Sequence, residues 1–234
     1  AGMTPSVYPE FLQHHYMITC MMFLVWGLIF WYGRKIPEAE KTRFGYILIG
    51  ICILQEIVDY WVRVQGAESG LYNFRLTKEL PLQPCHFAYF ASMLAIYTRK
   101  ESFFHIGYFF GMSGAFMGIL TPGEDGIYSL TSNLASHFQH SLIIVNLMWC
   151  ISALHMRATK RSIIHALIVL NVLILPISIY NYFTGENYFF LSQAPQTIIY
   201  NPIFPISTWP WYILWIEMIF IPYCYLFYLP IRKD

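Results

Sequence analysis

A cysteine and two histidines are the residues of this sequence whose chemistry pairs most readily. Cys85 follows Leu80-Pro81-Leu82-Gln83-Pro84, a run whose two prolines predict that a helix begins there. His137 and His140 are three residues apart, so on a helix they share one face. A histidine can take the thiol proton, and a helix N-terminus lowers a thiol pKa and offers N–H donors to an oxyanion. These residues predict nucleophilic catalysis by Cys85, with either histidine as the base.

Charged and polar residues accompany this set at similar positions in apolar segments. Glu56, Asp59 and Arg63 are spaced i, i+3 and i+7, and two later segments contain Asn181 and Glu217. An ionisable residue in hydrocarbon costs several kcal/mol, so it usually faces a cavity or a partner. At ~1.5 Å per helical residue, all of these side chains fall in the outer half of their helices. We therefore expect a polar cavity near the extracytoplasmic leaflet, in which His137, Asn181 or Glu56 orients His140.

Other interpretations of the same residues remain open at this point. Glu56, Asp59 and Arg63 are also the right types for a structural ion pair, or for the gated polar site of a transporter or of a protein that binds lipid or solute. His137 and His140 with two of those carboxylates could hold zinc, but His-x-x-His is a loose signal and no HExxH motif accompanies it. We expect no metal and no other cofactor.

Composition sets the class of protein in which this chemistry would take place. Of the 234 residues 57% are hydrophobic and 12% are charged, whereas soluble domains carry about 25% charged residues. The chain is therefore expected to be an integral membrane protein. A net charge of +1 leaves no basic surface for nucleic acid. Five isolated cysteines fit neither a disulfide framework nor a zinc ribbon.

Hydropathy predicts an all-α polytopic membrane protein with a single domain over residues 1–234 and seven transmembrane helices. Their approximate ranges are 14–33, 44–64, 81–98, 103–121, 133–156, 162–183 and 210–230. Of the 14 Lys and Arg residues, 11 fall on one side of this arrangement and three on the other. Because cytoplasmic loops are enriched in Lys and Arg, the N-terminus is expected outside and the C-terminus in the cytoplasm of a cell-membrane protein.

The fourth of these segments contains Gly107, Gly111, Gly114 and Gly118. Small residues at this spacing let a second helix approach closely. We therefore expect the four glycines to serve helix packing.

Several motifs resemble those of the YwaF-like bacterial integral membrane proteins and the transmembrane protein 164 acyltransferase family. Leu80-Pro81-Leu82-Gln83-Pro84-Cys85 is similar to an LPLQxC segment, and His140-Ser141-Leu142-Ile143 to a His-Gly-Leu-Ile segment. Asn187-Tyr188-Phe189-Phe190-Leu191 and Trp209-Pro210-Trp211-Tyr212-Ile213-Leu214 resemble an NYxxL and a PWPWYxL motif. Together the motifs cover roughly residues 50–225, which is most of the chain.

The resemblance implies a membrane-embedded acyltransferase that moves a fatty acyl chain onto a lysophospholipid, or a related acyl hydrolase. It implies Cys85 as nucleophile and His140 as base, with a phospholipid or lysophospholipid as partner and the acyl chain in apolar space beside the glycine-rich helix. Pro84 stands where the bacterial proteins usually have leucine, and Ser141 replaces a glycine. Neither change removes the nucleophile or the base.

Overall fold

The computed structural model describes residues 8–123, 127–194 and 208–233, and these ranges form helices with short connections. The all-helical class predicted from the sequence is confirmed. In chain order, the elements are α1 (Phe11–Gly33), α2 (Glu38–Glu68), α3 (Pro84–Thr98), α4 (Glu101–Phe110), the π-helix η1 (Gly111–Phe116), α5 (Met117–Leu120), α6 (Leu130–Ser152), α7 (Lys160–Thr184), the 3-10 turn η2 (Tyr188–Phe190), α9 (Trp211–Tyr228) and the 3-10 turn η3 (Leu229–Ile231).

Local signals in the sequence explain where several of these helices begin and end. α3 begins with Pro84, whose fixed φ suits the first turn of a helix and which has no N–H to leave unpaired. Capping boxes, formed by Ser129 with Ser132 and by Thr159 with Ser162, open α6 and α7. α7 ends at Thr184, and Gly185 caps it in the left-handed conformation with φ +73°.

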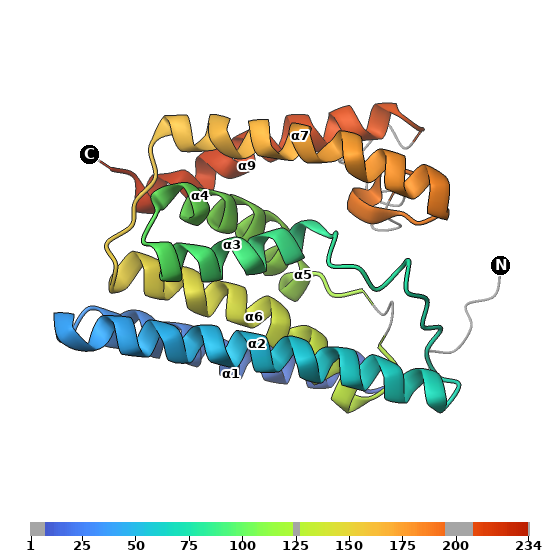
Figure 1. The fold of residues 1–234 in the computed structure, drawn as a ribbon, viewed down its shortest axis with the longest axis horizontal. Helices are drawn as coiled ribbons and strands as arrows, with labels where there is room; N and C mark the ends of the chain where they lie inside the picture. The colour runs from blue at the N-terminus through green and yellow to red at the C-terminus, as the bar shows by residue number, and fades with distance from the viewer. Residues whose placement is uncertain (1–7, 124–126, 195–207, 234) are drawn as a thin grey trace.

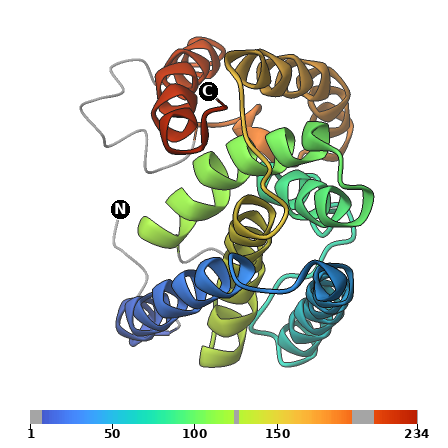
Figure 2. The same cartoon turned by 90° about the vertical axis from the view of Figure 1, so that its left-hand side faces the viewer.

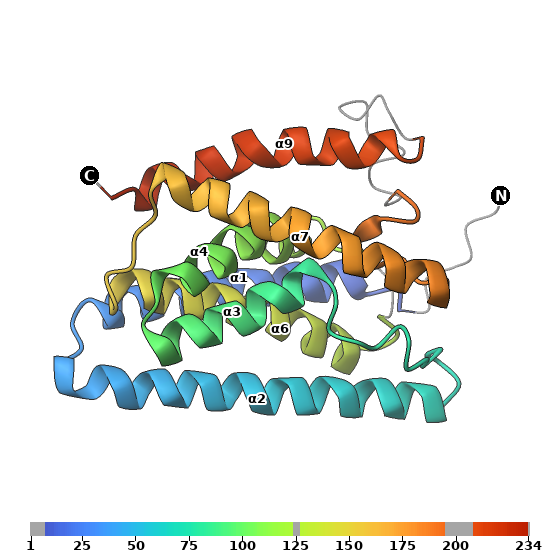
Figure 3. The same ribbon diagram turned by 45° about the horizontal axis from the view of Figure 1, so that its top comes forward.

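The long helices run along a common axis and form a layered bundle (Figures 1 and 3). α1, α2 and α6 lie on one side, α7 and α9 pair on the opposite side, and the α3–α4 hairpin lies between them (Figures 1 and 2). α6 is the most enclosed of the long apolar helices, because 67% of its apolar stretch is buried against 17% for α9. α6 therefore forms the centre of the core, and α9 covers its edge.

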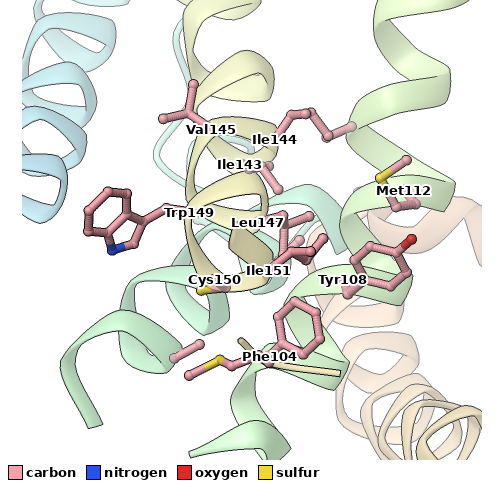
Figure 4. Close-up of a cluster of buried hydrophobic side chains, with 14 of the residues drawn as sticks. Phe104, Tyr108, Met112, Ile143, Ile144, Val145, Leu147, Trp149, Cys150 and Ile151 are labelled. Atoms are coloured by element: carbon pink, nitrogen blue, oxygen red, sulfur yellow. The ribbon is translucent and has the colours of Figure 1, made fainter. Parts of the chain in front are cut away.

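The core forms where α6 meets α4 and η1. Phe104, Tyr108 and Met112 pack against the face of α6 that carries Ile143 and Leu147 (Figure 4). These side chains are at most 7% exposed. This apolar contact fixes the position of η1 along α6. It therefore also sets the position of η1 relative to His140, which lies one turn before Ile144 on α6.

Two of the four glycines allow neighbouring helices to pack closely, as the sequence predicts. A Cβ on Gly107 would lie 3.1 Å from the backbone N of Ser92, and one on Gly111 would lie 2.8 Å from Cγ2 of Ile143. Gly114 and Gly118 differ, because a Cβ there would meet nothing closer than 3.9 Å. Packing therefore explains the first pair, and the second pair requires another explanation.

Replacing Gly111 with alanine is expected to destabilise the protein by about 1–3 kcal/mol, because the new methyl group would overpack a core that has no space for it. The matched control is Gly27→Ala on α1, where a Cβ has nothing within 4 Å. Thermal unfolding in one detergent compares the two variants. Equal melting temperatures for Gly111→Ala and Gly27→Ala would contradict the close contact with Ile143.

Five segments are long and apolar enough to cross a membrane: Phe11–Gly33, Glu101–Leu120, Leu130–Ser152, Lys160–Thr184 and Trp211–Ile231. They correspond to five of the seven predicted spans. The remaining two are α2 and α3. α2 has 31 residues but carries Glu56, Asp59 and Arg63 close together, and α3 has 15 residues, or ~22 Å of helix, where the hydrocarbon core is ~30 Å thick. A multi-pass membrane protein follows from the five apolar segments.

Most of the Lys and Arg residues lie at one end of the bundle, in the connections or in the helix turns next to them. The α1–α2, α3–α4 and α6–α7 connections and the C-terminal segment all lie at the left in Figure 1. Arg99, in the α3–α4 connection, donates to Thr42 near the start of α2 over 3.1 Å, and the backbone of Ala158 pairs with that of Arg232. The α2–α3 connection and the C-terminal end of α7, which precede Cys85 and follow Asn181, lie at the opposite end.

Candidate active site

Cys85 occupies the first turn of α3, one residue after Pro84. In this turn the N–H groups of His86 and Phe87 both donate to the backbone O of Gln83. In the described ranges, the N–H of Cys85 donates to no backbone carbonyl. A helix N-terminus whose first N–H groups adjoin a thiol is an arrangement that can stabilise negative charge.

His140 is held on α6 by its own helix. Its Nδ1 lies 3.0 Å from the backbone O of Ser136. Because a carbonyl can only accept, Nδ1 carries the proton, and in the neutral ring Nε2 keeps its lone pair. The sequence suggested His137, Asn181 or Glu56 for the orienting role, but the Ser136 carbonyl occupies that position in the structure. His140 thus presents an unprotonated Nε2, as a general base must.

His137 has both ring nitrogens engaged. Nε2 lies 2.9 Å from Oγ1 of Thr19, which donates its own proton to the backbone O of His15, so Nε2–H is the donor to Thr19. Nδ1 lies 3.0 Å from Oγ of Ser141 and accepts from that hydroxyl. His137 is also 1% exposed. It therefore links α6 to α1, and its lone pair is occupied.

Gly114 and Gly118 bring Cys85 and His140 to one helix face. The Cβ position of Gly114 lies 3.9 Å from the backbone N of Cys85, and that of Gly118 lies 3.9 Å from Nε2 of His140. The two glycines are four residues apart, which is one turn along the η1–α5 segment. Cys85 and His140 therefore face neighbouring positions on the same segment.

The thiol itself contacts the next residue. Cys85 Sγ lies 4.0 Å from Nδ1 of His86, a ring that is 8% exposed. In the described part of the chain, no hydrogen bond joins Cys85 Sγ to His140. Pairs of this kind are often loose without substrate and tighten when it binds. His86, which directly follows Cys85 in the sequence, is not among the predicted site residues.

Arg63 lies at the centre of a partly buried ion cluster beside α3. It contacts Asp59 at 2.5 Å, as the i, i+4 spacing on one helix predicts, and Glu79 at 2.7 Å. Glu79 also accepts from the hydroxyl of Tyr72 over 2.8 Å, and the Tyr60 hydroxyl donates to its backbone O. Burial and the bond to Glu79 raise the pKa of Tyr72, so its hydroxyl stays a donor at neutral pH.

Removing Arg63 is expected to cost about 3–5 kcal/mol of stability, because Asp59 and Glu79 would then be buried without a cation. The variant is Arg63→Met, which keeps the length of the side chain. The control is Arg43→Met, whose 3.8 Å pair with Glu40 is solvent-exposed and contributes about 1 kcal/mol or less. Chemical unfolding in detergent separates the two. A stability loss no greater for Arg63→Met than for Arg43→Met would contradict the ion cluster.

Glu56 lies on the same helix as this cluster but has a different partner. Its Oε2 accepts from Nε2 of Gln139 over 3.0 Å. Gln139 is 4% exposed and directly precedes His140. The Glu56–Gln139 bond therefore ties α2 to α6 next to the candidate base, although Glu56 does not bond to the imidazole itself.

Asn181 and Glu217 lie away from His140, among the α7 and α9 elements. The Asn181 side chain donates to the backbone O of Tyr188 and accepts from its N–H, at 2.9 and 3.0 Å. Asn181 thus fastens the turn after α7. Glu217 accepts from Nδ2 of Asn171 over 2.6 Å and forms part of the wall of an apolar cavity.

Sequence reasoning missed two residues that build this region. Glu79 is 2% exposed and belongs to a connection, where no periodicity marks a buried position. Gln139 lies between His137 and His140, and nothing about an amide side chain at this position predicts a buried contact with Glu56. The position of Glu79 immediately before the apolar Leu80-Pro81-Leu82 run is the one hint that the sequence offers.

The zinc alternative requires ligands that converge. Among residues 8–123, 127–194 and 208–233, no group of three His, Cys, Asp or Glu side chains is close enough to hold a metal ion. The ring nitrogens of His137 are engaged by Thr19 and Ser141, and Asp59 is engaged by Arg63. The geometry of the described residues therefore gives the zinc interpretation no support.

Comparison with known proteins identifies the family. No curated protein and no solved structure matches the chain. The TMEM164 family model matches residues 11–228, which include Cys85, His140 and all of the long helices from α1 to α9. The match covers nearly the whole chain, so this protein belongs to the TMEM164 family.

Proposed function

We propose that this protein is a membrane-embedded lipid acyltransferase or acyl hydrolase that uses Cys85 as nucleophile and His140 as base. The observation that carries the proposal is the shared helix face. His140 Nε2, left unprotonated by the bond from Nδ1 to Ser136, and the N–H of Cys85 face Gly118 and Gly114, one turn apart. An ester carbonyl placed over these glycines would meet the nucleophile's residue and the base together.

The proposed reaction proceeds through a thioester. His140 Nε2 takes the thiol proton, and the thiolate of Cys85 attacks the carbonyl carbon of a phospholipid ester. The N–H of Cys85 donates to the oxyanion of the tetrahedral intermediate. When the C–O bond breaks, His140 returns its proton to the lysophospholipid oxygen, which leaves the acyl group on sulfur. Water or a lysophospholipid hydroxyl then gives its proton to His140 and attacks the thioester carbonyl. The C–S bond breaks, the fatty acid or acylated phospholipid leaves, and His140 returns the proton to the Cys85 sulfur to regenerate the thiol.

The membrane arrangement is part of this proposal. We infer that α2 and α3 complete a seven-helix bundle, with the N-terminus outside and the basic end of the bundle in the cytoplasm. The chain direction then sets the N-terminus of α3, and with it Cys85, toward the extracytoplasmic leaflet of the cell membrane. α2 can cross the membrane despite its charged residues, because Asp59 and Arg63 of α2 and Glu79 of the following connection neutralise one another in part.

The test of this function uses purified protein in lipid nanodiscs containing a phosphatidylcholine with a labelled acyl chain. Chromatography of the lipids measures labelled fatty acid and, after addition of an unlabelled lysophospholipid, newly acylated phospholipid. Release of either labelled product supports acyl chemistry and shows which acceptor is used. Absence of both, with intact protein and several phospholipid headgroups, would contradict it and favour the alternative of a non-enzymatic binding or transport protein.

A further inference from the structure

An apolar cavity of about 550 Å³ lies between the α4–η1–α5 segment, α7 and α9. Its volume is typical of sites that enclose a small ligand, which range over about 300–1,000 Å³. The walls are mainly large apolar side chains: Phe110, Met117, Leu170, Ile174, Ile216 and Phe220. Along α9 the lining extends from Ile213 to Tyr223, a length of ~15 Å of helix. The cavity is thus elongated along the bundle axis.

The wall of the cavity meets the residues beside Cys85. Pro84, which directly precedes Cys85, and Gly114, whose Cβ position lies 3.9 Å from the Cys85 N, are both lining residues. At this point the wall has no side chain, whereas Gly107 and Gly111 are filled by neighbouring helices. The absence of a side chain at residue 114 leaves the first turn of α3 next to the cavity.

The turn after α7 closes part of the same cavity and is tied to the start of α3. Phe189 and Phe190 line the cavity with φ of 57° and 54°, a left-handed conformation that costs energy for residues with a Cβ. The Phe189 N–H donates to the side-chain oxygen of Gln83 over 3.2 Å, and the Tyr212 hydroxyl bonds to the backbone O of Phe190 over 2.5 Å. These bonds hold the two aromatic residues against the cavity.

We propose that this cavity holds a single long fatty acyl chain, that of the ester attacked by Cys85. The inference rests on the proposed function and adds which part of the substrate is bound and where. The lining favours a chain because it is apolar along its length, and the carboxylate in its wall, Glu217, already accepts from Asn171. Chain length, rather than headgroup, is then what this part of the protein distinguishes.

The first test narrows the cavity with Ile216→Trp and compares it with Met218→Trp, which alters the same helix at a side chain that is 62% exposed. Each protein receives dioctanoyl or dioleoyl phosphatidylcholine, and intact-protein mass measures the acyl group on Cys85. In Ile216→Trp we expect about tenfold less oleoyl adduct and little change for octanoyl, because the bulky side chain excludes the longer chain. Met218→Trp should match the unaltered protein for both lipids.

Equal loss of both adducts in folded Ile216→Trp, or no loss of either, would overturn the inference. Leu170→Phe on α7, paired with Val172→Phe at a side chain that is 66% exposed, repeats the comparison from another wall if the tryptophan variant does not fold. The chain-length dependence must then follow Leu170→Phe and not Val172→Phe.

A binding measurement separates this inference from the proposed chemistry. cis-Parinaric acid, a fluorescent long-chain fatty acid, is titrated into Cys85→Ala protein with and without Ile216→Trp. We expect about tenfold weaker binding with Ile216→Trp and no change with Met218→Trp. If the protein forms no thioester but this difference is present, the chemistry fails and the cavity stands. If the thioester forms but binding is unchanged, the cavity assignment fails alone.

Discussion

Replacing Cys85 with alanine should lower acyl-ester turnover by more than about 10³-fold, because it removes the sulfur that would carry the acyl intermediate. Fold should be retained, since alanine keeps the Cβ that packs against the core and removes one long polar contact, 4.0 Å from Sγ to Nδ1 of His86. The measurement is release of labelled fatty acid or acylated lysophospholipid by protein in nanodiscs. Melting temperature in the same preparation confirms that the variant is folded.

Cys20→Ala is the matched control for the Cys85 variant. Cys20 is exposed on α1, so a nonspecific reaction of thiols with the lipid would affect it as much as Cys85. Turnover should be unchanged in Cys20→Ala. Full turnover in Cys85→Ala would refute a cysteine nucleophile at this position, whatever the chemistry of the remaining residues.

Replacing His140 with alanine should lower turnover by about 10²–10⁴-fold, the range that a positioned general base contributes. Of the two candidate histidines, His140 is the one with a free lone pair. It lies on Nε2, since Nδ1 donates to the Ser136 carbonyl. His137→Ala should instead weaken the fold, by about 1–3 kcal/mol, because it leaves Thr19 and Ser141 without their buried partner. Turnover and melting temperature measured on both variants distinguish the two roles.

Imidazole added to the His140→Ala protein provides a second readout, because a small base can replace the missing ring but cannot restore a structural defect. Partial recovery of turnover with imidazole is expected for His140→Ala and not for His137→Ala. If His137→Ala lost turnover at full stability while His140→Ala kept it, the assignment of the base would be reversed.

Part of the fold and of the site was accessible from the sequence, because it depends on local periodicity. The apolar stretches predict helices, and the spacing of Asp59 and Arg63 predicts the ion pair that the structure contains. The two prolines before Cys85 predict the start of α3, which begins at Pro84. In each case residues close in the sequence determine the result.

Other features depend on contacts between distant segments, which periodicity does not record. Glu79 contacts Arg63 from the α2–α3 connection. The backbone carbonyl of Ser136 orients His140, whereas the sequence suggested a side chain for that role. The four glycines recur every three or four residues, yet packing from α3 and α6 gives Gly111 a different role from Gly114. The cavity is lined by residues of α4, η1, α5, α7 and α9 together, so the sequence of any one segment does not predict it.

The most direct test of the account is the mass of the protein after brief incubation with a phospholipid of known acyl chains. The account predicts one added acyl group, released by neutral hydroxylamine and located by peptide mapping on Cys85. The adduct should be absent from Cys85→Ala and should form much more slowly in His140→Ala. Phospholipid turnover without any adduct on Cys85, or an adduct whose formation does not depend on His140, would contradict it.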